Sequence, residues 1–309
     1  MTMTYRCCAA VAALLMAGAA QAQGAGEPGA SHVSGGVDAS NDSDRFNEFK
    51  PWAQYEAASG WGVRAGWQHY SLGDWSASGQ SLFVTHRWQR DAWSSNARLG
   101  LNHTDGRDHW VAAWDGMYKL APDTSAGISF ERDVVDSRWG IADGLMATTA
   151  MAVLDHQFTP NFGVGVAAGS TWFSDSNRRD ILRTRWTYTL SEEKGWYTYL
   201  TTRNFRFTDP YHYAYFSPDR FHEAALGLMW KTALNDWLVL SANADAGRQS
   251  IDGEGKPVWN FGLYLSSPLR ARVQWKVGFA SRNDHASPVS STAQSYRYTS
   301  FTAFVRVPF

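Results

Sequence analysis

The sequence has few charges, few cysteines and no long apolar run outside its first residues. Charged residues make up 18% of its 309 residues, below the roughly 25% of typical soluble domains. The 28 basic and 29 acidic residues nearly cancel, so no nucleic-acid partner is expected. Beyond the N-terminus, no segment has the about eighteen consecutive apolar residues of a spanning helix. Aromatics, by contrast, make up 15%, including 16 tryptophans.

The first 22 residues have the three parts of a secretory signal peptide. Arg6 supplies the positive charge, residues 9–20 form a short apolar core, and cleavage is expected after Ala22. The two cysteines, Cys7 and Cys8, leave with this segment. The remaining chain therefore has no thiol for disulfides, nucleophilic catalysis or metal binding. No other metal-ligand spacing is present, and we expect no metal and no cofactor.

Residues 23–51 and 52–309 differ in composition. The first range is rich in Gly, Ser, Asp and Asn and is expected to be a flexible periplasmic leader. The second alternates apolar and polar residues in stretches of about ten, the length of a membrane-spanning strand. The clearest stretch is 269–282, where Val273, Trp275 and Val277 alternate with polar residues.

This alternation predicts an all-β fold, a transmembrane up-and-down antiparallel β-barrel of about 14 strands, with 12 or 16 also compatible. The alternative is a soluble β-sandwich. Tight connections such as 122–123 and 266–268 alternate with longer ones, as periplasmic turns and external loops do. The expected longer connections are 71–79, 133–140, 209–218, 247–256 and 283–293.

The last stretch, 296–309, alternates down to a terminal Phe309. Bacterial outer-membrane barrels typically end on such a strand, so we expect a bacterial outer-membrane location, a lipid surround and recognition of this strand by the barrel-assembly machinery.

Charged residues on the polar side of the alternation are expected to line the lumen. They either form a polar conduit or close the lumen through ion pairs, and both readings stay open. Basic residues exceed acidic ones, which favours a neutral or anionic permeant. The expected lumen-lining residues are Arg64, Arg87, Arg98, Asp115, Glu131, Arg183, Arg185, Glu223, Asp245, Arg270, Arg272 and Lys276.

Catalysis is not indicated by any motif. Of the nine histidines, none has a serine and an acidic residue at a spacing that strands would bring together for a triad. His86, His103 and His222 fall on the apolar side and are expected near the membrane interface. We therefore expect no catalytic residue and no enzyme activity.

Three short motifs resemble one known family. They are the turn FSDSNRR at 173–179, the segment YAYFSPDRF at 213–221, and FERDVVDS at 130–137. Together they resemble the C-terminal barrels of bacterial exporters of cellulose and poly-β-1,6-N-acetylglucosamine. The resemblance covers 52–309. The sequence shows no counterpart of the helical-repeat scaffold that precedes the barrel in those exporters.

The resemblance implies passive export of a secreted polysaccharide. A separate periplasmic scaffold and an inner-membrane polysaccharide synthase would then be partners. The alternatives are a general or solute-specific porin, an outer-membrane enzyme acting on lipid or glycan, and a sealed structural barrel. The pore-mouth residues that the resemblance implies are Asp175, Asn177, Arg178, Tyr215, Phe216, Ser217 and Pro218.

Overall fold

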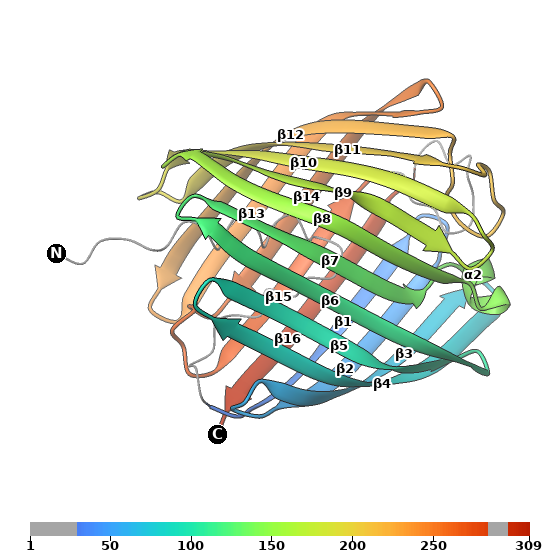
Figure 1. The fold of residues 1–309 in the computed structure, drawn as a ribbon, viewed down its shortest axis with the longest axis horizontal. Helices are drawn as coiled ribbons and strands as arrows, with labels where there is room; N and C mark the ends of the chain where they lie inside the picture. Colours follow the sequence, from blue (N-terminus) through green and yellow to red (C-terminus); the bar gives the residue numbers. More distant parts are fainter. Residues whose placement is uncertain (1–29, 284–295) are drawn as a thin grey trace.

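The chain forms one closed β-barrel (Figure 1). A computed structural model describes residues 30–283 and 296–309. Sixteen antiparallel strands follow one another around the ring in chain order, and β1 pairs with β16 to close it. The predicted fold class is confirmed, and the strand number lies at the top of the expected range. The strands are β1 (His32–Asp42), β2 (Asn47–Glu56), β3 (Trp61–Leu72), β4 (Trp75–Arg90), β5 (Trp93–Thr104), β6 (Arg107–Ala121), β7 (Thr124–Val134), β8 (Met146–Thr159), β9 (Phe162–Phe173), β10 (Arg178–Ser191), β11 (Trp196–Phe207), β12 (Arg220–Asn235), β13 (Leu238–Ile251), β14 (Glu254–Ser266), β15 (Gln274–Arg282) and β16 (Tyr298–Pro308).

The expectation of a flexible leader over 23–51 is wrong from residue 32 onward. β1 and most of β2 lie in this range. β1 pairs along its whole length with β16 on one side and with nearly all of β2 on the other. Its small and polar residues carry little hydrophobic signal, but backbone hydrogen bonds to two neighbours hold it in the ring. The expected signal peptide lies outside the described residues.

The outer face of the barrel is apolar. Leu82 and Leu101 keep 58% and 62% of their side-chain surface exposed, and Leu226 keeps 64%. In water such a band would be costly, whereas lipid is its natural solvent. Aromatic pairs such as Trp93–Tyr118 and Trp196–Trp230 lie where the strands end, as in the girdles of membrane barrels.

The two series of connections lie at opposite ends of the barrel, as predicted. The tight turns share one end with Phe309, whose N–H donates to the Ser31 carbonyl; this is called the terminus end. The other end carries the helix α2 (Arg138–Asp143) and is called the helix end (Figure 1). Among the described residues, no helix is long and apolar enough to cross a membrane.

Three expected boundaries are corrected. The segments 71–79 and 247–256 are not long loops, because the flanking strands continue to two-residue turns, where Gly73 and Gly253 have φ of 57° and 94°. Glycine adopts these angles without strain. The stretch 269–282 becomes a strand only at Gln274, because the chain first makes a turn after Pro268. The expected loop 283–293 lies almost wholly outside the described residues.

A buried ion network joins strands on either side of the closure. The Glu56 carboxylate of β2 accepts hydrogen bonds from Arg306 of β16, at 3.1 Å, and from Arg87 of β4. The side chains of Glu56 and Arg306 are each only 7% exposed. Because the carboxylate is shared by two guanidinium groups, its loss would remove the one negative charge that both of them contact, and Arg306 is buried.

We therefore expect Glu56→Gln to lower the free energy of unfolding by about 3 kcal/mol. The measurement is the temperature at which the detergent-solubilised barrel loses its compact mobility on SDS gels. Asp91→Asn is the matched control, since its pair with Arg90 is fully exposed to solvent on both sides and such pairs contribute little. Equal transition temperatures for the two variants would contradict this role of Glu56.

Candidate functional site: the lumen and its inward segments

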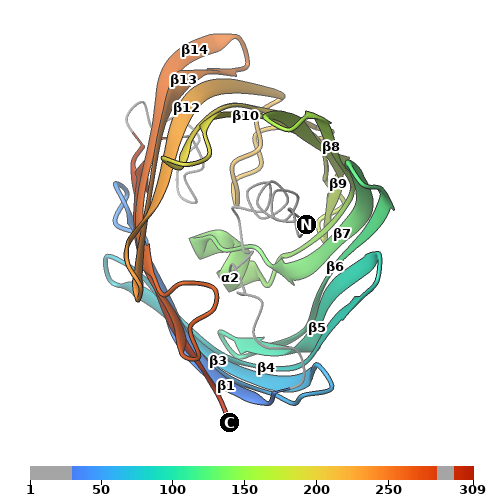
Figure 2. The ribbon, with the colours of Figure 1, turned by 90° about the vertical axis from the view of Figure 1, so that its left-hand side faces the viewer.

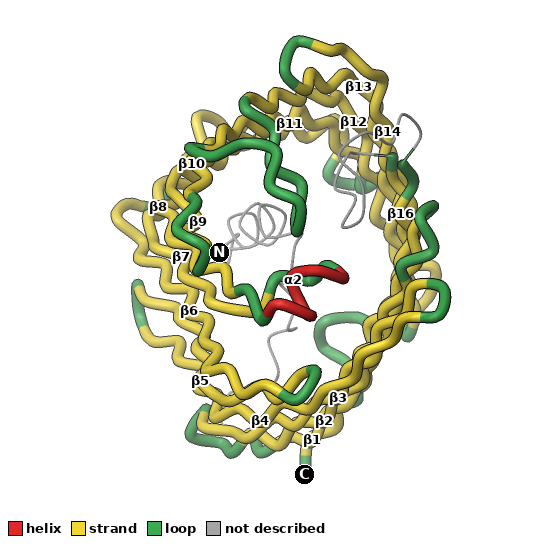
Figure 3. Tube along the Cα trace, turned by 90° about the vertical axis from the view of Figure 1, so that its right-hand side faces the viewer, coloured by secondary structure: helices red, strands yellow, loops and turns green. Residues whose placement is uncertain are grey.

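The inner face of the wall is identified by its contact with α2, which lies inside the barrel (Figures 2 and 3). Ile141 of α2 belongs to a buried cluster with Tyr70, Phe83 and Val111. Residues an even number of positions from these on the same strand share their face. Arg64 on β3, for example, lies on the inner face, with its guanidinium 4.2 Å from the Trp52 ring centroid.

The expected lumen-lining residues lie on this inner face, except for two. Arg270 and Arg272 lie in the turn before β15 and are exposed at the terminus end. The alternation was read correctly from Gln274 onward but extended too far toward Pro268. The inner-face residues are Arg64, Arg87, Arg98, Asp115, Glu131, Arg183, Arg185, Glu223, Asp245 and Lys276.

Ion pairs neutralise part of this lining. Arg98 donates to Glu131 at 3.0 Å, and Arg203 donates to Glu223 at 2.9 Å. Asp115 accepts a hydrogen bond from Ser129 at 2.7 Å. Arg203–Glu223 and Asp115–Ser129 connect neighbouring strands, and Arg98–Glu131 connects β5 with β7 past β6, so none of these contacts crosses the lumen.

The two sides of the lumen differ in charge. Carboxylates on the inner faces of β1, β2, β6 and β7 are interspersed with cations on β2 to β5, whereas the charged inner-face residues of β10 and β11 are cations alone. β2 and β10 lie eight places apart in the ring of sixteen, on opposite sides of the lumen. A solute in the lumen would therefore face a wall of mixed charge on one side and a basic strip on the other. The mixed wall carries Asp38, Asp42, Glu48, Glu56, Asp115, Glu131 and Asp133 together with Lys50, Arg64, Arg87 and Arg98, and the basic strip carries Arg179, Arg183, Arg185 and Arg203.

Residues 135–145, called the helix segment, fold from the helix end into the lumen. Ser137 caps α2, accepting a hydrogen bond from the Gly140 N–H at 2.9 Å, as an N-cap serine does. Asp136 receives hydrogen bonds from Lys50 at 2.6 Å and from the Tyr70 hydroxyl at 2.9 Å. Arg107 donates to the Ala142 carbonyl at 2.9 Å. The segment is thus fastened to β2, β3 and β6.

Residues 208–219, called the inward loop, connect β11 to β12 and also turn into the lumen (Figures 2 and 3). The Ser137 hydroxyl donates to the Ala214 carbonyl at 2.5 Å. Tyr213 donates to Asp143 at the other end of α2. The inward loop and the helix segment therefore support each other and narrow the helix end of the lumen.

A polar latch fastens the inward loop to the turn between β9 and β10. The Tyr215 hydroxyl donates to Asp175 at 2.8 Å and accepts from the Asn177 side-chain amide at 3.0 Å. The Asn177 side-chain oxygen Oδ1 accepts from the Asp209 N–H at 3.0 Å. Burial, and then the bond to Asp175, raise the pKa of Tyr215, so its hydroxyl stays protonated as a donor.

Aromatic rings of the wall pack against the Tyr215 ring of the latch. The Tyr215 ring lies parallel to Phe173 with centroids 4.3 Å apart, and Phe207 lies 6.0 Å away. The Arg179 guanidinium lies 5.9 Å from the Phe173 centroid and 5.7 Å from that of Phe207. The latch therefore connects the inward loop with a cation of the wall.

The structure brings most of the expected pore-mouth residues together. Asp175, Asn177, Tyr215 and Ser217 are connected through the latch and the turn, where the Ser217 hydroxyl accepts from the His212 N–H at 2.7 Å. Phe216 packs against Phe205 and Phe221 of the wall, and Pro218 is buried. Arg178 differs, since its exposed side chain pairs with Asp180 at 2.6 Å rather than with the inward loop.

Sequence reasoning missed α2 and two lumen arginines. A six-residue helix is too short to show a helical period, and its one signal is Ser137 as a cap. Arg179 was detectable, because it lies an even number of residues from Arg183 and Arg185 and so shares their face. Arg203 pairs directly with Arg183 and lies on the same face.

No catalytic arrangement is apparent in the part of the chain that the structure describes. His212 lies 3.4 Å from Asp175, but Ser217 contacts the His212 backbone rather than its ring. His86, His103 and His222 lie close to strand ends, and His86 stacks on Trp61 at 4.3 Å. Within residues 30–283 and 296–309, no group of three metal-ligating side chains is present.

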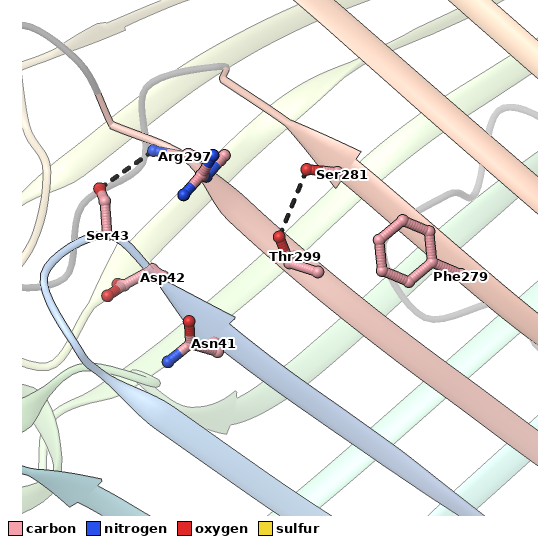
Figure 4. A pocket seen from close by; sticks show the side chains of 7 residues that line it. All are labelled: Asn41, Asp42, Ser43, Phe279, Ser281, Arg297 and Thr299. Carbon is pink, nitrogen blue, oxygen red and sulfur yellow. Dashed lines mark hydrogen bonds between the residues drawn. The ribbon is translucent and has the colours of Figure 1, made fainter.

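A recess of about 260 Å³ lies outside the lumen (Figure 4). It opens at the helix end, where β1, β15 and β16 meet, and Ser281 and Thr299 hydrogen-bond at 3.3 Å in its wall. We assign it no function. Its lining residues are Asn41, Asp42, Ser43, Phe279, Ser281, Arg297 and Thr299.

The closed ring with an apolar outside and a polar inside defines a transmembrane β-barrel, which is the class of this protein. No family model and no curated protein matches the sequence.

Two solved structures show the same fold. A bacterial polysaccharide outer membrane secretin is similar to this chain, with a TM-score of 0.70, 12% identity, and coverage of 91% of this chain and 99% of that one. CdiB from Acinetobacter baumannii has a TM-score of 0.52 and 9% identity, over 89% of this chain and 60% of that one. At these identities the similarity shows the fold of outer-membrane β-barrels and no more.

If the latch holds the inward loop in place, removing one of its hydrogen bonds should make the loop more accessible to proteases. Tyr215→Phe removes the hydroxyl that joins Asp175 to Asn177 and leaves both without one partner, which costs about 1–3 kcal/mol. The loop should open more often, and we expect faster cleavage by chymotrypsin after the aromatic residues of 208–219 in the folded, detergent-solubilised protein.

Tyr213→Phe is the matched control. It also loses one hydroxyl bond to a carboxylate, but Tyr213 is 65% exposed, so water can replace that bond. Cleavage at the wild-type rate in Tyr215→Phe would show that the latch does not hold the loop.

Proposed function

We propose that this protein is a bacterial outer-membrane conduit through which a secreted polysaccharide passes passively. The observation that carries the proposal is the polar lumen of a sixteen-stranded barrel, a size at which barrels hold an aqueous channel. The similarity to a polysaccharide outer membrane secretin over nearly its whole length supports the same class of cargo. Energy would come from polymer synthesis at the inner membrane, through a separate synthase and scaffold.

The lumen residues would replace part of the hydration shell of the polymer. Charged side chains and hydroxyls on the inner face offer hydrogen bonds, and Tyr264 and Tyr298 offer ring surface on β14 and β16. The pore-mouth residues, Asp175, Asn177, Arg178, Tyr215, Phe216, Ser217 and Pro218, would hold or border the inward loop, and the loop would set the width of the entrance.

A solute-specific porin is the second candidate. The inward loop and the helix segment favour it, because a constriction inside the lumen selects small solutes by size. The two functions differ in what happens at this constriction. A polymer conduit must let a chain thread past the loop, whereas a porin keeps the constriction closed to chains.

We expect discrete current steps when the refolded protein is inserted into a planar bilayer. Replacing 210–216 by a short Gly-Ser linker should increase single-channel conductance, because the loop narrows the lumen. Complete absence of current at every voltage, in wild type and linker variant alike, would overturn both the conduit and the porin.

Soluble oligosaccharides of increasing length separate the two candidates. Blocking events whose duration grows with chain length indicate a threading polymer and support the conduit. Exclusion of every chain longer than a disaccharide by the wild type, with blocking only in the linker variant, indicates a porin.

A further inference from the structure

Four arginines lie on the inner faces of β10 and β11, and we call them the arginine stripe: Arg179, Arg183, Arg185 and Arg203. Arg183 and Arg203 are direct cross-strand partners. Like charges in this position repel each other at the close spacing of paired residues. Within 162–207, the inner faces of β9, β10 and β11 carry no carboxylate to offset them.

Most of the stripe lacks an acceptor for its buried donors. The Nε groups of Arg179, Arg183 and Arg185 are shielded from solvent and have no hydrogen-bond partner among the described residues. Arg185 is only 8% exposed, and its guanidinium lies over the Tyr199 ring at 4.0 Å. Ring faces and one threonine hold Arg179 and Arg185, and none of Arg179, Arg183 and Arg185 forms an ion pair with a carboxylate among the described residues.

The nearby carboxylates neutralise the stripe only at Arg203, which donates to Glu223 on β12 at 2.9 Å. Asp245 on β13 accepts from the Tyr199 hydroxyl at 2.8 Å and from Asn260 at 3.0 Å. Asp155 on β8 is separated from Arg185 by the β9 residue Gly165, and the described structure has no ion pair between them.

The stripe borders a smooth strip of wall. The inner face of the neighbouring strand β9 consists of small side chains, Gly163, Gly165, Ala167 and Gly169. From Arg179 near the helix end to Arg185, the stripe extends about 20 Å along β10 at the usual rise of a strand. A chain lying against β9 would therefore pass several cations in succession.

The geometry points to a binding track for the carboxylate groups of an anionic saccharide chain, formed by the arginine stripe. This assignment rests on the proposed conduit function and names its substrate class. Arginine forms paired hydrogen bonds with a planar carboxylate. A repeating anion would offset the unpaired charges of Arg179, Arg183 and Arg185 and relieve the repulsion between Arg183 and Arg203. The sugar rings between successive carboxylates would lie on the small side chains of β9.

The experiment measures binding of trigalacturonate, a carboxylate-bearing trisaccharide, to the refolded protein in detergent by isothermal titration calorimetry. Maltotriose is the neutral probe of equal length. We expect trigalacturonate to bind and maltotriose to bind at least tenfold more weakly. Arg183→Gln should weaken trigalacturonate binding about tenfold, since it removes one charge-assisted contact.

Arg98→Gln is the matched control. It removes the same charge from the inner face, but Arg98 is engaged by Glu131 and lies outside the stripe. Both variants should shift the ion selectivity of the channel toward cations, whereas only Arg183→Gln should weaken trigalacturonate binding. A similar loss of affinity in both variants would indicate a general field effect and would overturn the track.

Two further probes test whether the stripe prefers carboxylates over sulfate or phosphate groups. Sulfated maltotriose or inorganic phosphate binding more tightly than trigalacturonate would overturn the assignment to carboxylates. Calorimetry needs no current, so the two proposals can fail separately. Binding of trigalacturonate by a protein that conducts no current would support the track and contradict the conduit. Equal affinity for maltotriose and trigalacturonate in a protein that conducts current would support the conduit and contradict the track.

Discussion

The fold depends on one constraint, that every backbone N–H and C=O facing lipid must find a partner within the protein. A sheet with free edges cannot satisfy it, but a closed ring can. Here the closure is the pairing of β1 with β16 from His32–Pro308 to Asp42–Tyr298. This pairing needs no pattern of apolar side chains, since its hydrogen bonds connect the two backbones. This is why the Gly- and Ser-rich β1 can complete the ring.

The same constraint explains which parts of the fold were predictable. Strands with large apolar residues on one face, such as 61–70 and 93–103, are evident from alternation alone. β1 is not, because its neighbours rather than its side chains make it a strand. The start of the strand predicted at 269–282 was also wrong. Residues 269–273 continue the alternation of apolar and polar side chains, but they follow a turn after Pro268 and do not pair with a neighbouring strand. For the candidate site, individual lumen residues were predictable, but the inward loop was not, since it depends on contacts such as Ser137–Ala214 between distant segments.

The inner face shows two ways of treating a charge away from bulk water. On β2, β4 and β16, cations and Glu56 form a closed network that satisfies its own members. On β10 and β11, Arg179, Arg185 and Arg203 lie over aromatic rings, which hold a cation but accept few of its hydrogen bonds. The first arrangement is balanced within the wall, whereas the second leaves Arg179, Arg183 and Arg185 without a paired carboxylate. The network that stabilises the barrel and the stripe that we propose to bind an anion thus lie on different sides of the lumen.

The inward loop and the wall act on different properties of a permeant. The wall is held by continuous ladders, so its charges have fixed positions, and it determines chemistry. The inward loop is held by side-chain bonds at Tyr215 and Ser137, which break more easily than a ladder, and it determines width. Arg179 belongs to both, because its guanidinium lies against Phe173 and Phe207, the rings on which Tyr215 packs. An anion drawn to Arg179 would compete with this ring packing, so occupancy of the first cation in the stripe would act directly on the support of the loop above it.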